Sequence, residues 1–333
     1  MKQIPGHGVL WNALCRVLAP SASLHVRRAR PRVHACLIYH GITAPGDTPA
    51  FDDDVQTPVA TLTRHLELLL GLGATPTTID EIAATVARNE PLPPFSASIT
   101  FDDAYANVAA NALPVLSAHG FAATIFAPVD YIGTDRLLWN DRVHALIAGD
   151  PDLVRRAAEA AGIGPVSSTT ALVYALKDVP DATRRETIDR LGDWSGLPGD
   201  TAPGGSRICS EAELADLQER GWSVGSHTLS HPMLTRLSEE DARREIAGSR
   251  ERLAEMLGAP PRGFAYPNGE FGESHMRMVS DAGYEYAVTT EGALTGASQD
   301  PVALSRIYPK AHEARFTCLV TGFEQRARAM LGR

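Results

Sequence analysis

The sequence predicts an α/β fold, an irregular (β/α) barrel of about seven parallel strands that carries a helical insert. Two observations predict the barrel. Strand-like and helix-like segments alternate from residue 33 to the end of the chain, and ionisable residues directly follow several of the strand-like segments. A third observation predicts the insert, because residues 135–207 interrupt this alternation with helix-prone stretches and a run rich in Pro, Gly, Ser and Thr.

The first half of the barrel is predicted from strand and helix signals in order. Residues 33–39 form an apolar first strand. Thr57 and Pro58 predict the start of a helix, because threonine can cap a first turn and proline fits the first helical position. Leucines then recur at helical spacing between residues 62 and 70. A capping box at residues 78–81 opens the next helix.

The second half repeats the pattern of strand followed by helix. After a strand that ends at Phe101, residues 105–119 are predicted to be helical, with Pro114 kinking or ending the helix. A capping box at residues 210–213 opens a later helix. The remaining predicted elements are strands 122–127 and 222–225, helix 238–257, strand 263–266, helix 274–282, strands 286–289 and 303–307, and a last helix at 315–331.

Within the insert, residues 142–148 and 152–161 are helix-prone, whereas residues 194–206 are rich in turn-forming residues. The segment is expected to lie over the mouth of the barrel and not to form an independent domain. Trp139 lies within it and is a candidate for contact with a substrate. The alternative role for Trp139 is to hold the insert to the barrel.

Composition limits the classes of protein to consider. The chain has 333 residues with a net charge of −9 and a pI near 5.7, which argues against a nucleic-acid partner. The four cysteines are scattered and form no CxxC pair. Cysteine ligation of zinc and a dense disulfide framework are therefore not expected, and the pattern favours a reducing compartment.

The N-terminal segment, residues 1–32, is set apart from a domain that spans residues 33–333. Residues 8–19 predict an amphipathic helix, and an arginine cluster follows it. This helix is expected either to pack on the outside of the fold or to lie on an anionic membrane surface through residues 8–32. It is too short to span a membrane, and its interrupted apolar run does not match a typical signal peptide. The expected location is cytoplasmic, at the inner membrane face if the helix binds lipid, with export left open. The apolar face comprises Leu10, Leu14, Val17 and Leu18.

Two short segments carry the most informative chemistry. Asp102 and Asp103 are adjacent, and His227 and His231 lie four residues apart. One carboxylate and two imidazoles make a three-ligand site for a divalent metal that keeps a position open for water. The second carboxylate is placed to act as a base, so the pattern predicts metal-assisted hydrolysis.

Each segment also has a plainer interpretation. Histidine pairs at this spacing occur on surfaces and in loops, and an aspartate just before a helix is often an N-cap. Both segments, however, follow a β-like stretch at its carboxyl end. In α/β barrels that edge carries the catalytic residues, so the shared context favours a functional site.

Three segments resemble the polysaccharide deacetylases of carbohydrate esterase family 4, the NodB-homology domain. Thr-Phe-Asp-Asp at residues 100–103 is similar to the first motif of that family, and His-Thr-x-x-His at residues 227–231 is similar to the second. Phe-Ala-Tyr-Pro-Asn-Gly at residues 264–269 is similar to the third. The resemblance covers about residues 33–310, and motifs in the right order are more specific than any one of them.

The resemblance implies a role for each matching residue. Asp103, His227 and His231 would bind a divalent metal, usually zinc in this family, with cobalt, manganese or nickel as alternatives. Asp102 would be the general base. The backbone N–H of Asn268 would help to hold the oxyanion, and Tyr266 would lie near the substrate.

The sequence departs from the family pattern at the partner of the base. Many members have an arginine that is held against the base aspartate, but Ala265 stands at that position, and Asn268 replaces a tyrosine. Arg306 is the expected substitute partner of Asp102, and the alternative for Arg306 is a surface ion pair.

A second departure concerns the general acid. The late Leu-x-His motif of the family corresponds here to residues 304–306, which contain no histidine. Residues 38–41 resemble the first strand of the poly-N-acetylglucosamine deacetylase branch, so the resemblance assigns the acid role to His40. The alternative for His40 is a turn-capping histidine. His312 is the reserve candidate, and His275 is expected to be structural.

The expected function is a metal-dependent hydrolase that removes N-acetyl groups from the amino sugars of a polysaccharide, an oligosaccharide or a glycan precursor. One alternative is a deformylase or deacetylase of a lipid-linked amino sugar, which the N-terminal helix would suit. Another alternative is a catalytically inactive carbohydrate-binding module on the same fold. The presence of all three metal-ligand residues argues against the inactive module.

Overall fold

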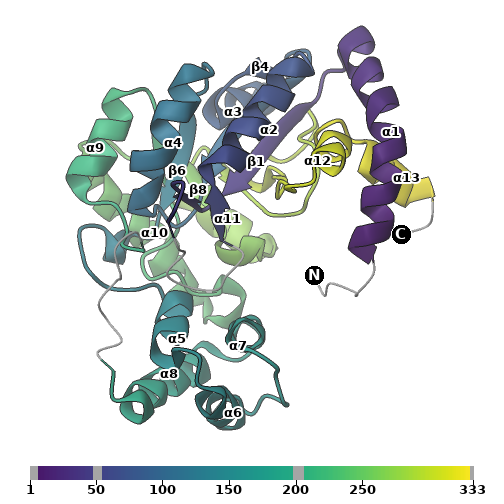
Figure 1. Ribbon diagram of the computed structural model, residues 1–333. Helices are drawn as coiled ribbons and strands as arrows, with labels where there is room; N and C mark the ends of the chain where they lie inside the picture. Colours follow the sequence, from purple (N-terminus) through teal and green to yellow (C-terminus); the bar gives the residue numbers. More distant parts are fainter. Residues whose placement is uncertain (1–6, 48–54, 198–205, 331–333) are drawn as a thin grey trace.

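A parallel sheet forms the centre of the computed structural model, which describes residues 7–47, 55–197 and 206–330 (Figure 1). The sheet has seven strands in the order β1-β5-β6-β7-β8-β9, and β4 pairs with β5 beside that path. A second small sheet joins β2 to β3. The strands are β1 (His34–Tyr39), β2 (Gly41–Thr43), β3 (Gln56–Pro58), β4 (Thr75–Pro76), β5 (Ser96–Phe101), β6 (Ala123–Ala127), β7 (Ser223–Ser226), β8 (Gly263–Ala265) and β9 (Tyr286–Val288).

The sheet closes between β9 and β1 through a segment that is not a regular strand. Leu304 bridges to Val288 of β9, and Ile307 bridges to Leu37 of β1, both in parallel. The backbone N–H of Ile307 donates to the carbonyl of Cys36 at 2.7 Å. The predicted strand at residues 303–307 is therefore wrong in detail, because Ala303 belongs to a 3-10 turn (η4, Pro301–Ala303) and only two isolated bridges follow. The predicted fold class, an irregular α/β barrel, is confirmed.

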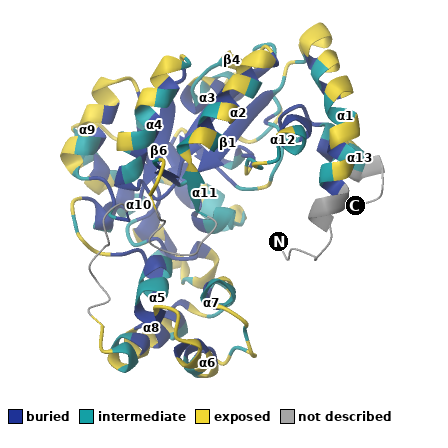
Figure 2. Ribbon diagram, in the orientation of Figure 1, coloured by how far each residue is buried: buried dark blue, intermediate teal, exposed yellow. Residues whose placement is uncertain are grey.

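The barrel strands are buried, and helices cover their outer side. All six residues of β1 and all six of β5 are buried, as expected for parallel strands covered on both faces. Figure 2 shows the surrounding helices buried on the side that faces the strands and exposed on the other. In α2, Leu62, Leu66 and Leu69 are fully buried, as their spacing predicts. The covering helices are α2 (Val59–Gly71), α3 (Ile79–Ala87), α4 (Ala106–Ala118), α9 (Glu211–Glu219), α10 (Glu239–Leu257) and α11 (Glu273–Asp281).

Some of the predicted helix ends agree with the structure, and others do not. Both capping boxes are present, at Thr78 before α3 and at Ser210 before α9. The start of α2 was predicted wrongly, because Pro58 is the residue before the helix and makes no side-chain cap. Pro114 lies inside α4, which continues to Ala118.

The predicted last helix is two helices, α12 (Glu313–Val320) and α13 (Phe323–Met330). Gly322 separates them with a φ of +72°, a left-handed conformation that glycine adopts without strain. Residues 331–333 of the predicted helix lie outside the described residues.

The N-terminal helix α1 (His7–Ala29) packs on the outside of the barrel against α12, and it is longer than predicted (Figure 1). Trp11 and Cys15 are buried with Cys318. The predicted apolar face is wrong at Val17, which is 74% exposed. Within the described ranges, no helix is both long and apolar enough to cross a membrane. Contact of residues 8–32 with a membrane surface stays a prediction.

The described part of the insert forms a lobe at the carboxyl end of the sheet, below the barrel in the view of Figure 1. It has a hydrophobic cluster of its own, to which Met233 of the barrel contributes. Helices were predicted for two of its segments but not for the other two, and residues 198–205 lie outside the described ranges. The insert helices are α5 (Trp139–Ile147), α6 (Pro151–Ala160), α7 (Thr169–Leu176) and α8 (Asp181–Ser195).

His34 on β1 gives the fold a testable dependence on pH. Its ring is fully buried between the hydroxyls of Ser96 and Ser98, at 3.0 and 2.9 Å, and burial lowers its pKa to about 3. The unfolded chain therefore takes up a proton first, and the stability that neutral His34 contributes above about pH 6.5 is lost as the pH falls towards 3.

We expect His34→Gln to reduce the slope of the unfolding free energy against pH between pH 6 and 4 by up to ~1.4 kcal/mol per pH unit. Urea denaturation at several pH values measures this slope. A variant whose slope equals that of the wild type would contradict the prediction.

Candidate active site

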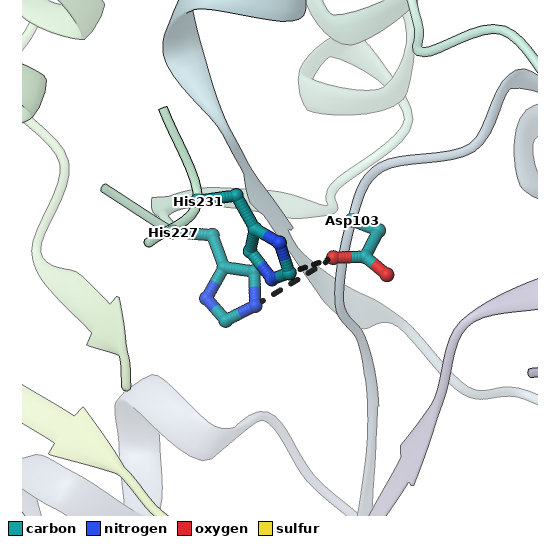
Figure 3. Close-up of side chains that lie close together, drawn as sticks. All are labelled: Asp103, His227 and His231. Carbon is teal, nitrogen blue, oxygen red and sulfur yellow. Dashed lines mark ion pairs between the residues drawn. The ribbon is translucent and has the colours of Figure 1, made fainter. Parts of the chain in front are cut away.

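Four ionisable side chains meet at the carboxyl ends of β5 and β7. Asp102 and Asp103 directly follow β5, and His227 directly follows β7. Figure 3 shows Asp103 facing the imidazoles of His227 and His231. Asp103 Oδ1 lies 3.7 Å from His227 Nε2 and 3.3 Å from His231 Nε2. One ligand atom from each of the three residues lies within 4.8 Å of the others.

The donor set fits a small divalent cation. Ligands at ~2.0–2.1 Å from a tetrahedral zinc ion lie ~3.3 Å from one another, close to the separations in this cluster. His227 Nδ1 lies 2.8 Å from the carbonyl oxygen of Ala265, which can only accept, so this nitrogen carries the hydrogen and Nε2 keeps its lone pair. Burial lowers the pKa of both histidines, which keeps the imidazoles in the neutral form that binds metals.

A buried carboxylate from α10 holds the loop between the two histidines. Glu245 is 7% exposed, and its carboxylate accepts hydrogen bonds from the backbone N–H groups of Leu229 and Ser230, each at 2.9 Å. It also accepts one from the Ser230 hydroxyl at 2.7 Å. Because this loop carries His231, Glu245 fixes the place of one metal-ligand candidate relative to the other.

The backbone is strained where these residues lie. Nine non-glycine residues of the described chain have a positive φ, and five of them are at this edge of the barrel. A left-handed conformation costs a non-glycine residue on the order of 1 kcal/mol and persists where the surrounding structure imposes it. The five are Asp103 (67°), Ala104 (53°), Thr228 (70°), His231 (58°) and Asn268 (58°).

Asp102 forms a fully buried ion pair with Arg306. Arg306 Nη1 and Nη2 donate to the two carboxylate oxygens at 2.6 and 2.7 Å. Arg306 is 0% exposed, and Nε donates to the carbonyl of Thr289 at 3.0 Å. Burial tends to raise the pKa of Asp102, but the charge and hydrogen bonds of Arg306, together with the nearby His227 and His40, outweigh it and bring the pKa to about 2. Asp102 is therefore an anion at any pH near neutral. The surface ion pair considered for Arg306 is excluded by its burial.

His40 follows β1 at the same edge. Its ring stacks on Tyr308, with centroids 6.1 Å apart and an angle of 7°. Burial lowers its pKa to about 4, and the charge of Asp102 opposes this effect. The imidazole is therefore neutral near pH 7, so an acid role requires that it gain a proton during turnover.

The other predicted residues divide between the site and the surrounding structure. Asn268 lies in the loop after β8, where its side-chain oxygen accepts from Lys177 Nζ at 2.9 Å. Tyr266 is fully buried and donates its hydroxyl to the carbonyl of Val302, and its place beside the substrate stays a prediction. Trp139 is 8% exposed within the insert cluster. His312 caps α12 and bonds to Arg16 of α1, which is a structural position.

Two residues of this edge, Glu245 and Lys177, were not among the predicted site residues. Glu245 lies within α10 and Lys177 directly follows α7, and no local motif marks either of them. Their partners are 15 to 91 residues away in the chain, so only the folded structure reveals the contacts. A weak signal for Glu245 was its position among the apolar residues of α10, where it is buried.

The fold and this edge define an α/β-barrel protein with an Asp-His-His cluster beside a buried aspartate. Residues 89–287, more than half of the chain, match the polysaccharide deacetylase family. The chain belongs to this family. YxkH of Bacillus subtilis strain 168, whose name places it among the polysaccharide deacetylases, is 28% identical over 98 residues. That match covers 29% of this chain and 35% of the relative.

Solved structures of deacetylases share the fold. The deacetylase PplD of Streptococcus pyogenes, solved in complex with acetate, aligns with a TM-score of 0.58 and 17% identity, over 87% of this chain and 98% of that one. IcaB from Ammonifex degensii aligns equally well, with a TM-score of 0.58 and 16% identity over the same shares of the two chains. A de-N-acetylase from Aggregatibacter actinomycetemcomitans has a TM-score of 0.56 at 13% identity, over 84% of this chain and 95% of its own. At these identities the similarity concerns the fold.

The support of the histidine loop by Glu245 gives a prediction for metal affinity. We expect Glu245→Ala to weaken zinc binding ~10–100-fold, because the loop that carries His231 loses three hydrogen bonds. Competition with a chromophoric chelator measures the affinity. Glu251→Ala, at an exposed position of the same helix, is the matched control. Equal affinities of the two variants would show that Glu245 does not hold the loop.

Proposed function

We propose that this protein is a metal-dependent hydrolase that removes N-acetyl groups from amino sugars of a polysaccharide, an oligosaccharide or a glycan precursor. The observation that carries the proposal is the buried cluster of Asp103, His227 and His231 next to the ion-paired carboxylate of Asp102. Membership of the polysaccharide deacetylase family supports the choice of an N-acylated sugar as substrate.

Asp103, His227 and His231 would hold the cation, and their mixed nitrogen and oxygen donors suit zinc, cobalt, manganese or nickel. A bound divalent cation supplies an acidified water and polarises the carbonyl of the amide. Burial of the three side chains excludes bulk water from one side of the cluster. Asp102 is left outside this donor set, with its Oδ2 3.9 Å from His227 Nε2.

Asp102 would be the base that accepts the proton of the attacking water. The base must be anionic before turnover, and Arg306 keeps it so. The pair also orients the carboxylate, because two parallel hydrogen bonds from a guanidinium leave little rotational freedom. The remaining lone pairs of the carboxylate can then accept the proton.

His40 would deliver a proton to the leaving nitrogen, and the backbone N–H of Asn268 would donate to the developing oxyanion. The position of His40 at the carboxyl end of β1 and its electrostatic interaction with Asp102 support the first assignment. The strained, left-handed backbone of Asn268 supports the second, since such strain is typical of residues that present a backbone group to a ligand.

The alternatives receive less support. An inactive carbohydrate-binding module would not need the metal-ligand set that is retained here. A lipid-linked substrate at the cytoplasmic membrane face would suit an exposed N-terminal helix, but α1 is tied to the barrel through Trp11, Cys15 and Arg16. A deformylase would use the same site residues, so the identity of the released acid distinguishes it.

An acyl-release assay tests the proposal directly. The wild-type protein loaded with zinc is expected to release acetate from at least one member of a panel of N-acetylated and N-formylated sugars, from monosaccharides to polymers and lipid-linked forms. Chelator should abolish the release, and added zinc should restore it. Release of formate alone would favour the deformylase, and the absence of both zinc uptake and acyl release would favour the binding module.

Variants of the aspartate pair separate the two roles. We expect Asp103→Ala to lose both metal and activity, whereas Asp102→Asn should keep metal and lose turnover by ~10²–10⁴-fold. Metal content by plasma emission spectroscopy and turnover by acetate release are the measurements. If Asp102→Asn keeps at least a tenth of wild-type turnover, the base assignment is wrong.

His40→Ala is expected to lower kcat by ~10²-fold with a smaller effect on KM, because a proton donor acts in the transition state. The comparison of kcat and KM with the wild type over pH 5–9 tests this assignment. An unchanged kcat and pH profile would mean that the proton taken by Asp102 returns to the amine without His40.

A further inference from the structure

Lys177, at the end of α7 in the insert, reaches the loop that follows β8. Its Nζ donates to Asn268 Oδ1 at 2.9 Å and lies 4.8 Å from the centroid of the Tyr174 ring. The chain has only three lysines among 31 basic residues, so arginine is its usual cation. A lysine held at the edge of the site is therefore distinctive in this chain.

The end of α7 is fixed to the barrel by a second set of contacts. Arg236 lies in η2 (Leu234–Arg236), soon after the histidine loop. Its Nε donates to the backbone carbonyl of Lys177 at 3.4 Å, and its Nη2 donates to Asp178 Oδ1 at 3.2 Å. The backbone of Lys177 is thus anchored independently of its side chain. The contact of the ammonium with Asn268 is not needed to hold the helix.

The charge of Lys177 also interacts with two of the metal-ligand candidates. Burial lowers the pKa of Lys177, and the carboxylates of Asp103 and Glu270 oppose this effect. The charge of Lys177 in turn contributes to the lowered pKa of His231, after burial and His227. Asp103 and His231 belong to two different loops, so the charge of Lys177 interacts with groups of both loops.

We propose that Lys177 is a catalytic residue that donates a hydrogen bond to the acyl oxygen of the substrate and then holds the acetate product. The inference rests on the proposed function and adds to it a residue supplied by the insert. The ammonium has three donors. One is used by Asn268, the residue whose backbone N–H is proposed to donate to the oxyanion, so the ammonium lies beside a residue of the proposed oxyanion site.

No covalent bond of Lys177 forms or breaks in the proposed reaction. Water adds to the amide carbon, its proton passes to Asp102, and the carbonyl oxygen gains negative charge. The C–N bond then breaks, the nitrogen receives a proton and leaves as a free amine, and the acyl group leaves as acetate. Lys177 stays protonated throughout. Its cation stabilises first the oxyanion and then the carboxylate, as an oxyanion-hole donor does.

The test compares Lys177→Met, Lys177→Arg and Arg236→Met in the zinc-loaded enzyme. We expect Lys177→Met to lower kcat by ~10²-fold with little change in KM, since a contact strongest in the transition state affects turnover. Lys177→Arg should recover part of the loss. Arg236→Met removes the helix anchor but keeps the ammonium, and should stay within about threefold of the wild type.

Product inhibition provides a readout besides turnover. Acetate should bind Lys177→Met at least ~10-fold more weakly than the wild type, while zinc content and thermal unfolding remain those of the wild type. Equal inhibition by acetate and equal kcat in an active wild type and Lys177→Met would overturn this inference alone. Equal losses of kcat in Lys177→Met and Arg236→Met would show that Lys177 only anchors the end of α7, and would also overturn this inference. No acyl release by the wild-type enzyme would overturn the proposed function together with this inference.

Discussion

The buried ion pair between Asp102 and Arg306 is the constraint on which the site depends. Arg306 lies in the segment that closes the barrel, and its guanidinium bonds to the end of β5, to Thr100 within β5 and to the carbonyl of Thr289 after β9. Thr100 in turn donates to the carbonyl of Leu37 in β1. Removing one partner from such a pair typically costs ~3–5 kcal/mol, because the other charge is left buried and unpaired. One side chain therefore both ties the closing segment to β5 and helps to keep the proposed base anionic.

The site is assembled from two structural layers. The barrel supplies side chains at the ends of its strands, where β5 places the aspartates and β7 places the first histidine. Helices then fix or complete these groups: α10 holds the histidine loop through Glu245, and α7 brings Lys177 to Asn268. This division places the proposed chemistry on the strand ends and its supporting contacts on a covering helix and the insert.

Much of this arrangement could be predicted from the sequence, because its signals are local. The aspartate and histidine pairs each follow an apolar strand, and strand ends in a parallel barrel share one edge. The capping boxes of α3 and α9 could also be predicted, because their residues lie close together in the sequence. Tyr266, Glu245 and Lys177 could not be placed in this way. The contacts of all three residues are made with partners that are distant in the chain. The closing segment was predicted as a strand, although only Leu304 and Ile307 in it make bridges.

The left-handed backbone at Asp103, His231 and Asn268 has a consequence for durability. Glycine would relax each of these positions, and at Asp103 and His231 it would also remove a side chain that is proposed to bind the metal. Selection for thermal stability alone would therefore favour replacements that stabilise the protein but abolish its proposed activity. The strained residues at this edge therefore carry a cost in stability that their proposed roles in metal binding and catalysis would explain.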